Sequence, residues 1–241
     1  MQDRSSLPAD VQRTLGLLTD GVHEILRRAF VSLFAYGALA FPHPDGWRAD
    51  LDFHVLVERP LTQDEQAAVN TLHADIGHDL DGYYITLDDA RRAEPPPHQL
   101  DTRRRDEAWA LHRAHVLAGR YFVIFGVDPR DIIPSATLTE LQAALRHELR
   151  FVEAHPDDAA FGILNAVRIL YSVEHRDVVV SKYAAAQWAR DRFPQEECAA
   201  VDAAARAYVN EGRRRDDLLL SDGWSAVVAR ARSALAQAER P

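Results

Sequence analysis

The pattern of strand-forming residues stops at Pro134, and this constrains the fold more than any other feature of the sequence. Before Pro134, short runs rich in aromatic and β-branched residues alternate with segments whose apolar residues recur at helical spacing. After it no strand-like run occurs, alanine becomes more frequent, and the pattern is helical to the end of the chain. We therefore expect the α+β fold class, with a mixed β-sheet and flanking helices in a first domain (residues 1–134) and an α-helical bundle in a C-terminal domain (residues 135–241).

In the first domain the residue patterns predict both kinds of element. Strands are expected over residues 30–36, 51–58, 83–87 and 121–125, and helices over residues 11–28, 63–76 and 107–118. Thr62 and Glu65 have the spacing of a capping box, which favours a helix start at residue 63. Loops are expected between Phe41 and Trp47 and over residues 91–105, which contain three consecutive prolines.

In the second domain only helices are expected. They cover residues 138–154, 158–175, 181–192 and 195–212, and residues 223–238 also have a helical pattern. No internal repeat is evident.

Charge, cysteine content and hydropathy limit the partners. The chain has 37 acidic and 28 basic residues, a formal charge of −9, which argues against duplex nucleic acid and favours a cationic partner. The single cysteine cannot form an internal disulfide, and no zinc-binding spacing occurs. The N-terminus lacks the features of a signal peptide, and the longest apolar stretch, about residues 30–41, is too short for a membrane span. We expect a cytoplasmic protein without a membrane partner, and no feature of the sequence indicates an oligomeric state.

Lys182 is the only lysine among the 28 basic residues. Lysine provides a compact ammonium group with three rotatable donors, whereas arginine provides a planar fork, so a site that needs the ammonium geometry would resist replacement by arginine. The alternative is that one lysine has survived by chance. The composition alone does not favour either explanation.

A short acidic motif follows the first strand and its glycine turn. If the second strand already begins at Asp50, the period of two places the carboxylates of Asp50 and Asp52 on one face, roughly 6–7 Å apart. Paired carboxylates suit Mg²⁺, which takes oxygen ligands and is often held together with substrate phosphates. Gly37, at the end of the preceding strand, would let the backbone approach a phosphate closely. An Asp-x-Asp motif on a strand is, by itself, more often structural.

The glycine turn and Asp-x-Asp together resemble the metal and phosphate site of the polymerase-β-like nucleotidyltransferases, whose motif is Gly-Ser, a spacer and Asp-x-Asp. A second resemblance lies in residues 164–171, which contain Arg168, and in residues 180–189, which contain the pattern Ser-Lys-x-Ala-Ala-x-x-Trp-Ala. These segments resemble the helical domain of the aminoglycoside 3″-adenylyltransferases, which modify streptomycin and spectinomycin. The two resemblances cover most of the chain, and the proline-rich middle matches least.

The resemblance implies an Mg²⁺-dependent enzyme that transfers AMP from ATP to a hydroxyl of an aminoglycoside-type antibiotic, a cationic small molecule. Residues 1–134 would then form the nucleotidyltransferase domain. Asp50 and Asp52 would bind Mg²⁺, and Gly37 and Ala38 would contact the phosphates. Arg168 and Lys182 would reach the same phosphates from the helical domain.

Two positions depart from the family pattern. Ala38 stands where the motif has serine, which removes one hydrogen bond worth about 1–3 kcal/mol to a charged phosphate. Asp81 stands where the family has a catalytic Glu, and a displacement of about 1 Å at a reacting centre can cost roughly a hundredfold in rate. Asp81 could instead be a third metal ligand. Two alternatives therefore stay open: the same fold acting on a protein or metabolite acceptor, or a catalytically impaired nucleotide-binding module.

Three aromatic or imidazole side chains near this motif are also candidates for the site. His54 falls on the same strand face as Asp50 and Asp52. Tyr83 and Trp109 could stack on a base or a sugar. For all three we expect packing rather than binding.

Overall fold

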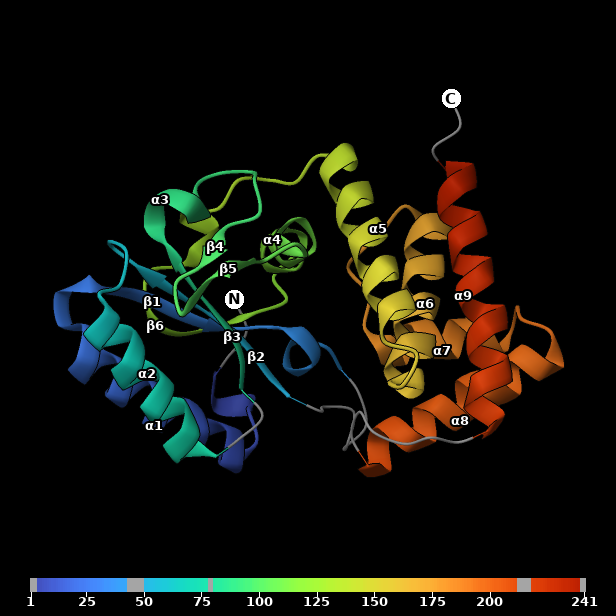
Figure 1. Ribbon diagram of the computed structural model, residues 1–241, viewed down its shortest axis with the longest axis horizontal. Helices are drawn as coiled ribbons and strands as arrows, with labels where there is room; N and C mark the ends of the chain where they lie inside the picture. Colours follow the sequence, from blue (N-terminus) through green and yellow to red (C-terminus); the bar gives the residue numbers. More distant parts are fainter. Residues whose placement is uncertain (1–3, 43–49, 78–79, 212–217, 239–241) are drawn as a thin grey trace. The chain divides into compact units, whose positions relative to one another are not determined.

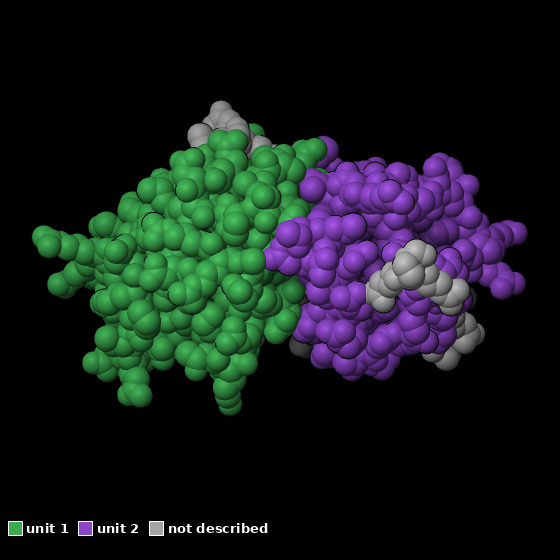
Figure 2. Space-filling model, turned by 90° about the horizontal axis from the view of Figure 1, so that it is seen from above, with its two compact units in different colours: residues 1–41, 50–136 green, residues 42–49, 137–241 purple. Residues whose placement is uncertain are grey.

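The computed structural model describes residues 4–42, 50–77, 80–211 and 218–238. The chain divides into two compact units, one of residues 1–41 and 50–136 and the other of residues 42–49 and 137–241 (Figures 1 and 2). The expected loop between Phe41 and Trp47 falls almost entirely outside the described residues.

The first unit is built on a four-stranded mixed sheet with the order β3-β2-β1-β6. Strand β1 (Phe30–Ala35) pairs antiparallel with β2 (Leu51–Val57) and with β6 (Phe122–Gly126), whereas β2 pairs parallel with β3 (Leu80–Thr86). The parallel register places Asp52 opposite Asp81. The expected mixed sheet is confirmed.

Helices cover this sheet from both sides. Helices α1 (Ala9–Leu26) and α2 (Gln63–Ile76) lie side by side (Figure 1), and their apolar residues share one core cluster with Phe53 and Val55. The opposite face carries a second cluster, which includes Trp109 of α4 (Trp109–Leu117). Because side chains alternate along a strand, Asp52 and Asp81 belong to this second face.

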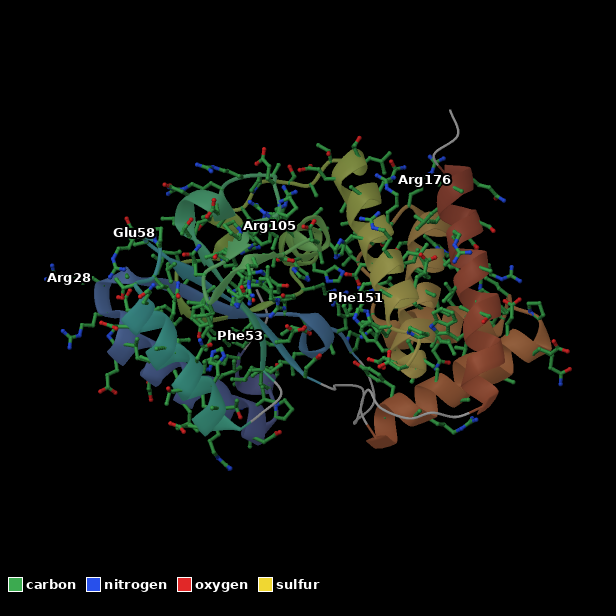
Figure 3. All side chains as sticks on the ribbon, in the orientation of Figure 1. Arg28, Phe53, Glu58, Arg105, Phe151 and Arg176 are labelled. Atoms are coloured by element: carbon green, nitrogen blue, oxygen red, sulfur yellow. The ribbon has the colours of Figure 1, made fainter. Side chains whose placement is uncertain are left out.

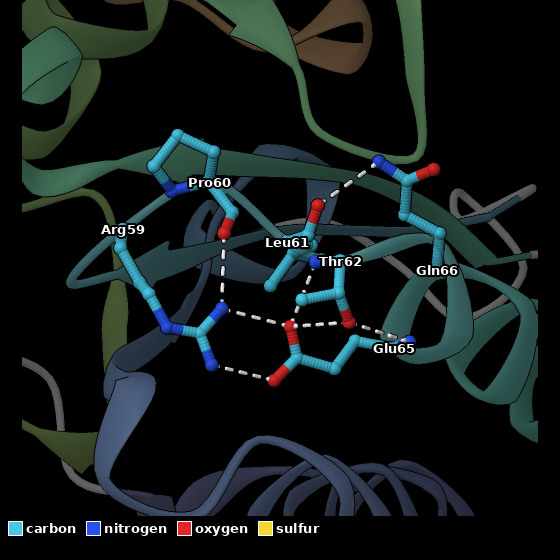
Figure 4. Close-up of polar contacts among 6 residues, drawn as sticks. All are labelled: Arg59, Pro60, Leu61, Thr62, Glu65 and Gln66. Carbon is cyan, nitrogen blue, oxygen red and sulfur yellow. Dashed lines mark hydrogen bonds and ion pairs between the residues drawn. The ribbon is translucent and has the colours of Figure 1, made fainter.

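The start of α2 shows why its boundaries were predictable. Thr62 Oγ1 accepts a hydrogen bond from the Glu65 backbone N–H at 3.3 Å, and Thr62 N donates to Glu65 Oε2 at 2.8 Å (Figure 4). Arg59 adds an ion pair to the same carboxylate at 2.8 Å, and its hydrogen bond is the main reason that the pKa of Glu65 falls to about 2. The predicted capping box is confirmed, and α2 ends at Gly77, which has a left-handed φ of 67°.

The prediction of a loop over residues 91–105 is confirmed for residues 91–96 but wrong from Pro97 on. Strands β4 (Pro97–His98) and β5 (Asp101–Arg105) form a two-stranded antiparallel sheet there. One backbone bond and one bond to a side chain join the segment to β3: Gln99 N donates to Tyr84 O at 2.7 Å, and Tyr84 N donates to His98 Nδ1 at 3.1 Å. Since β5 is mostly solvent-exposed arginine, it lacks the apolar alternation by which strands are recognised.

The third strand also begins three residues earlier than expected, at Leu80. Its early part contains Gly82, which packs against the ring of Phe53 (labelled in Figure 3) where any Cβ would clash. Gly82 weakens the strand pattern in the sequence while the packing requires it. The short helix α3 (Leu87–Ala90) follows β3 directly.

The second unit consists of helices throughout its described part. They are α5 (Leu138–Ala154), α6 (Ala159–His175), α7 (Lys182–Arg190), α8 (Gln195–Glu211) and α9 (Leu218–Ala238). Helix α6 packs against each of the other four and is buried over most of its length (Figure 1). The expected helical bundle is therefore confirmed. None of the helices in the described ranges combines the length and apolar character that crossing a bilayer requires.

Candidate functional site

Three carboxylates converge at one edge of the first unit's sheet. Asp50, Asp52 and Asp81 each offer an oxygen, and these oxygens lie within 4.8 Å of one another. The parallel pairing of β2 and β3 brings Asp81 beside Asp52, and the period of two brings Asp50 to the same face. All three residues are half-buried. This donor set consists of carboxylate oxygens alone, which fits a hard divalent cation such as Mg²⁺.

Gly37 is required by the position of Asp52. Its φ of +64° lies in the left-handed region, and a Cβ at this position would overlap the Asp52 carboxylate. Tyr36 N donates to Asp52 O at 3.0 Å, so the turn after β1 is tied to the start of β2. Gly37 and Ala38 begin the 3₁₀ turn Gly37–Ala40 and therefore lie next to the carboxylates.

A buried polar cluster lies on the same face of the sheet. Asp106 Oδ2 is 2.9 Å from His54 Nε2 and 2.8 Å from His112 Nδ1. His54 and Asp106 are almost completely inaccessible, and the His112 side chain is 20% exposed. The ligand-type atoms of these three residues also lie within 4.8 Å of one another. Both imidazoles already bond the same carboxylate oxygen, whereas His54 Nδ1 is buried and has no hydrogen-bond partner among the described residues.

The ionisation of this cluster follows from burial and from its own contacts. Burial by itself would raise the pKa of Asp106, but the charge and hydrogen bond of His112, together with His54, hold it well below the usual range. Burial lowers the pKa of His54, an effect that its bond to Asp106 only partly opposes. An ionised Asp106 therefore accepts hydrogen bonds from both rings, and His54 is neutral with its proton on Nε2.

The cluster and the carboxylates are neighbours along β2. His54 follows Asp52 by two residues, a step of about 7 Å along one face of the strand. Tyr36 belongs to both groups: its ring lies 5.0 Å from that of His54. Burial is the main cause that raises the pKa of Tyr36 well above its usual value, and the charges of Asp106, Asp52 and Asp81 act in the same direction. Tyr36 therefore stays protonated between two anionic groups.

The expectations for His54 and Trp109 are confirmed. His54 stacks on Phe34 with ring centroids 5.4 Å apart, and Trp109 is 1% exposed. Tyr83 is half-buried, and the Arg104 guanidinium lies 5.4 Å from its ring centroid. The partner of His54 was missed. Asp106 is 52 positions away, and its local signal is only that of an acidic residue just before a helix.

Arg168 and Lys182 belong to the second unit, on α6 and α7, which pack against each other. Arg168 lies 3.7 Å from Glu148 Oε2, and the buried Asn165 donates to the same oxygen at 2.8 Å. Ser181 caps α7 by accepting from Ala184 N at 3.0 Å, which puts Lys182 in the first helical turn. The expected N-cap is confirmed, whereas a joint approach of these cations to the carboxylates stays a prediction.

Comparisons with known proteins agree with the resemblance found in the sequence. Residues 131–237 match the family described as the C-terminal domain of aminoglycoside adenylyltransferase. Among solved structures the chain is similar to spectinomycin adenyltransferase AAD(9) from Enterococcus faecialis, whose structure contains ATP and spectinomycin. The TM-score is 0.76 at 14% sequence identity, over 91% of this chain and 98% of that one. At this identity the likeness shows a shared fold. No match was found among curated protein sequences.

Proposed function

We propose that the chain transfers AMP from ATP to a hydroxyl group of an aminoglycoside-type antibiotic, because residues 131–237 match the C-terminal domain of aminoglycoside adenylyltransferase. The observation that carries the proposal is the convergence of Asp50, Asp52 and Asp81 at the edge of a sheet whose fold is that of a spectinomycin adenyltransferase. The proposed activity needs ATP, so we propose a cytoplasmic location, where ATP is available.

In the proposed reaction the acceptor oxygen attacks the α-phosphorus of ATP, the bond to the β-phosphate oxygen breaks, and pyrophosphate leaves. Asp50, Asp52 and Asp81 would hold Mg²⁺, which neutralises charge on the phosphates as the bond breaks. Asp81 has two carboxylate oxygens, so one can face the cation while the other accepts the proton of the attacking hydroxyl. This assigns to Asp81 the role that the family gives to a longer glutamate.

The remaining groups would bind the phosphates. The turn at Gly37 and Ala38 would present backbone N–H groups beside the carboxylates. Arg168 would bind as a fork and Lys182 as a point charge at the first turn of α7, where the helix dipole also favours an anion. The excess of acidic residues would attract a cationic acceptor.

Release of pyrophosphate tests the proposal. Purified protein with ATP, Mg²⁺ and streptomycin or spectinomycin should release pyrophosphate, and Asp50→Asn should abolish the release. Asp64→Asn, an exposed position in the first turn of α2, is the matched control and should retain it.

Other outcomes would point elsewhere. Failure to bind ATP in the presence of Mg²⁺ would overturn the nucleotidyltransferase assignment. Binding of ATP without modification of any compound in an antibiotic panel would overturn the acceptor. Labelling of a protein by ATP would then favour a protein acceptor, and binding without any transfer would favour the impaired module that Ala38 and Asp81 suggest.

A further inference from the structure

The only lysine of the chain lies against two aromatic rings. Lys182 Nζ is 4.1 Å from the ring centroid of Phe161 and 5.0 Å from that of Tyr208. The three residues come from α6, α7 and α8, so this aromatic clamp depends on the packing of the helical unit. Tyr208 is 3% exposed, while Phe161 and Lys182 are half-buried.

The clamp has two physical effects on Lys182. An ammonium group over a ring face is attracted by the ring quadrupole, so its long stem is restricted before any ligand arrives. The rings carry no net charge of their own, so these two contacts restrict the ammonium group without removing its charge.

We propose that Phe161 and Tyr208 are positioning residues, which fix the Lys182 ammonium in the place where it meets the triphosphate of ATP. This inference rests on the proposed function, because it assigns Lys182 to the phosphates. It also offers a reason for the one lysine among 27 arginines: a compact ammonium fits between two rings, whereas a planar guanidinium would have to stack on one of them.

Because Lys182 is unique, its environment can be observed directly. Reductive methylation with ¹³C-formaldehyde labels only Lys182 and the N-terminal amine, and it keeps the positive charge. A methylammonium group over aromatic rings should show an upfield-shifted NMR signal, and Lys182→Arg identifies that signal by removing it. Phe161→Leu should move the signal toward the position of an exposed lysine.

The second measurement is the affinity of the unmodified protein for ATP with Mg²⁺, by titration calorimetry. Phe161→Leu should raise the Kd for ATP by about three- to tenfold, the effect of losing one cation–π contact. Tyr208→Phe keeps the ring and should keep both the signal and the affinity. Phe193→Leu is the matched control, because it removes a ring of the same unit that carries Arg230 at 5.1 Å instead of Lys182.

The outcomes test two claims separately: that Lys182 lies between the two rings, and that this position matters for ATP binding. A methyl signal at the exposed position in the wild type would refute the clamp. A shifted signal that Phe161→Leu abolishes, with no more change in ATP affinity than Phe193→Leu causes, would refute the positioning role. If the signal is shifted but Lys182→Ala leaves ATP binding intact, the phosphate role of Lys182 in the proposed function fails, although the clamp itself stands.

Discussion

Substitution of Asp106 should lower the stability of the first unit strongly. Its Oδ2 accepts from His54 on β2 and from His112 on α4, at 2.9 and 2.8 Å. Asp106→Ala leaves two imidazole N–H groups without their acceptor, at a cost of about 1–3 kcal/mol for each buried donor. His112 is 20% exposed, so water can replace part of its bond, and the buried charge disappears with the substitution. We therefore expect a total loss of about 2–4 kcal/mol.

That loss is large beside a typical free energy of unfolding of about 5–15 kcal/mol. Urea denaturation at pH 7 measures it. Asp106→Asn should cost less, about 1–2 kcal/mol, because the amide oxygen can still accept while the charge is lost. The control is Asp88→Ala, whose carboxylate is 79% exposed and pairs with Arg91 at 3.4 Å, and we expect a change within about 0.5 kcal/mol. If Asp106→Ala and Asp88→Ala unfold at the same urea concentration with equal m-values, the argument from burial is wrong.

Three further predictions follow from single positions. Burial lowers the pKa of His98 to about 4, so the contribution of the neutral His98 to the free energy of unfolding is complete above pH 6.5 and declines as the pH falls. Urea denaturation of the wild type should show a free energy of unfolding that is about 2 kcal/mol lower at pH 5 than at pH 7, and His98→Gln should reduce this difference. Equal differences in the wild type and in His98→Gln would contradict the prediction. Gly37→Ala should abolish Mg²⁺-dependent ATP binding, measured by calorimetry, because the new Cβ would displace the Asp52 carboxylate. Gly77→Ala is the control: it has the same left-handed strain, at φ +67°, but its Cβ would meet no atom within 4 Å, so this variant should lose stability and still bind ATP normally. Equal ATP binding by the two variants would refute the clash. Lys182→Arg should weaken ATP binding in the same assay although it keeps the charge, and unchanged affinity would mean that the unique lysine has no special role.

Elements whose signals are local could be predicted from the sequence. The bounds of α2 agree with the expected range because the helix starts at a capping box whose partners, Thr62 and Glu65, are three residues apart. The bounds of α5 agree with the range expected from the spacing of its apolar residues, and this helix also starts at a capping box, at Thr137. The boundary between mixed and helical sequence near Pro134 was visible for the same reason, since it depends only on the spacing of apolar residues.

Features that depend on packing were missed. The ladder of β4 and β5 is joined to β3 by the bond from Gln99 N to Tyr84 O and by the bond from Tyr84 N to the His98 ring, and its exposed arginines give no strand pattern. Asp106 and His54 are 52 positions apart in the sequence and meet only in the folded unit. The rings around Lys182 come from helices before and after its own, so spacing along the chain could not indicate them.

The candidate site could be predicted in part from local sequence and in part only from the family resemblance. Asp50 and Asp52 could be paired from the period of a strand, which is local. Asp81 could be placed beside them only through the family resemblance, because its convergence depends on the parallel register of β2 and β3.

That parallel register also has a consequence for how the protein folds. Parallel strands cannot be joined by a tight turn, and the chain reaches β3 from β2 only by way of α2. Such non-local pairing forms slowly, because the entropy cost of closing the connecting segment comes before any stabilising contact between the strands has formed. A folding intermediate in which β1 and β2 have paired but β3 has not docked would carry Asp50 and Asp52 without Asp81. The complete set of carboxylates would therefore appear only when the last strand of this edge is in place, and cation binding during refolding would report that step.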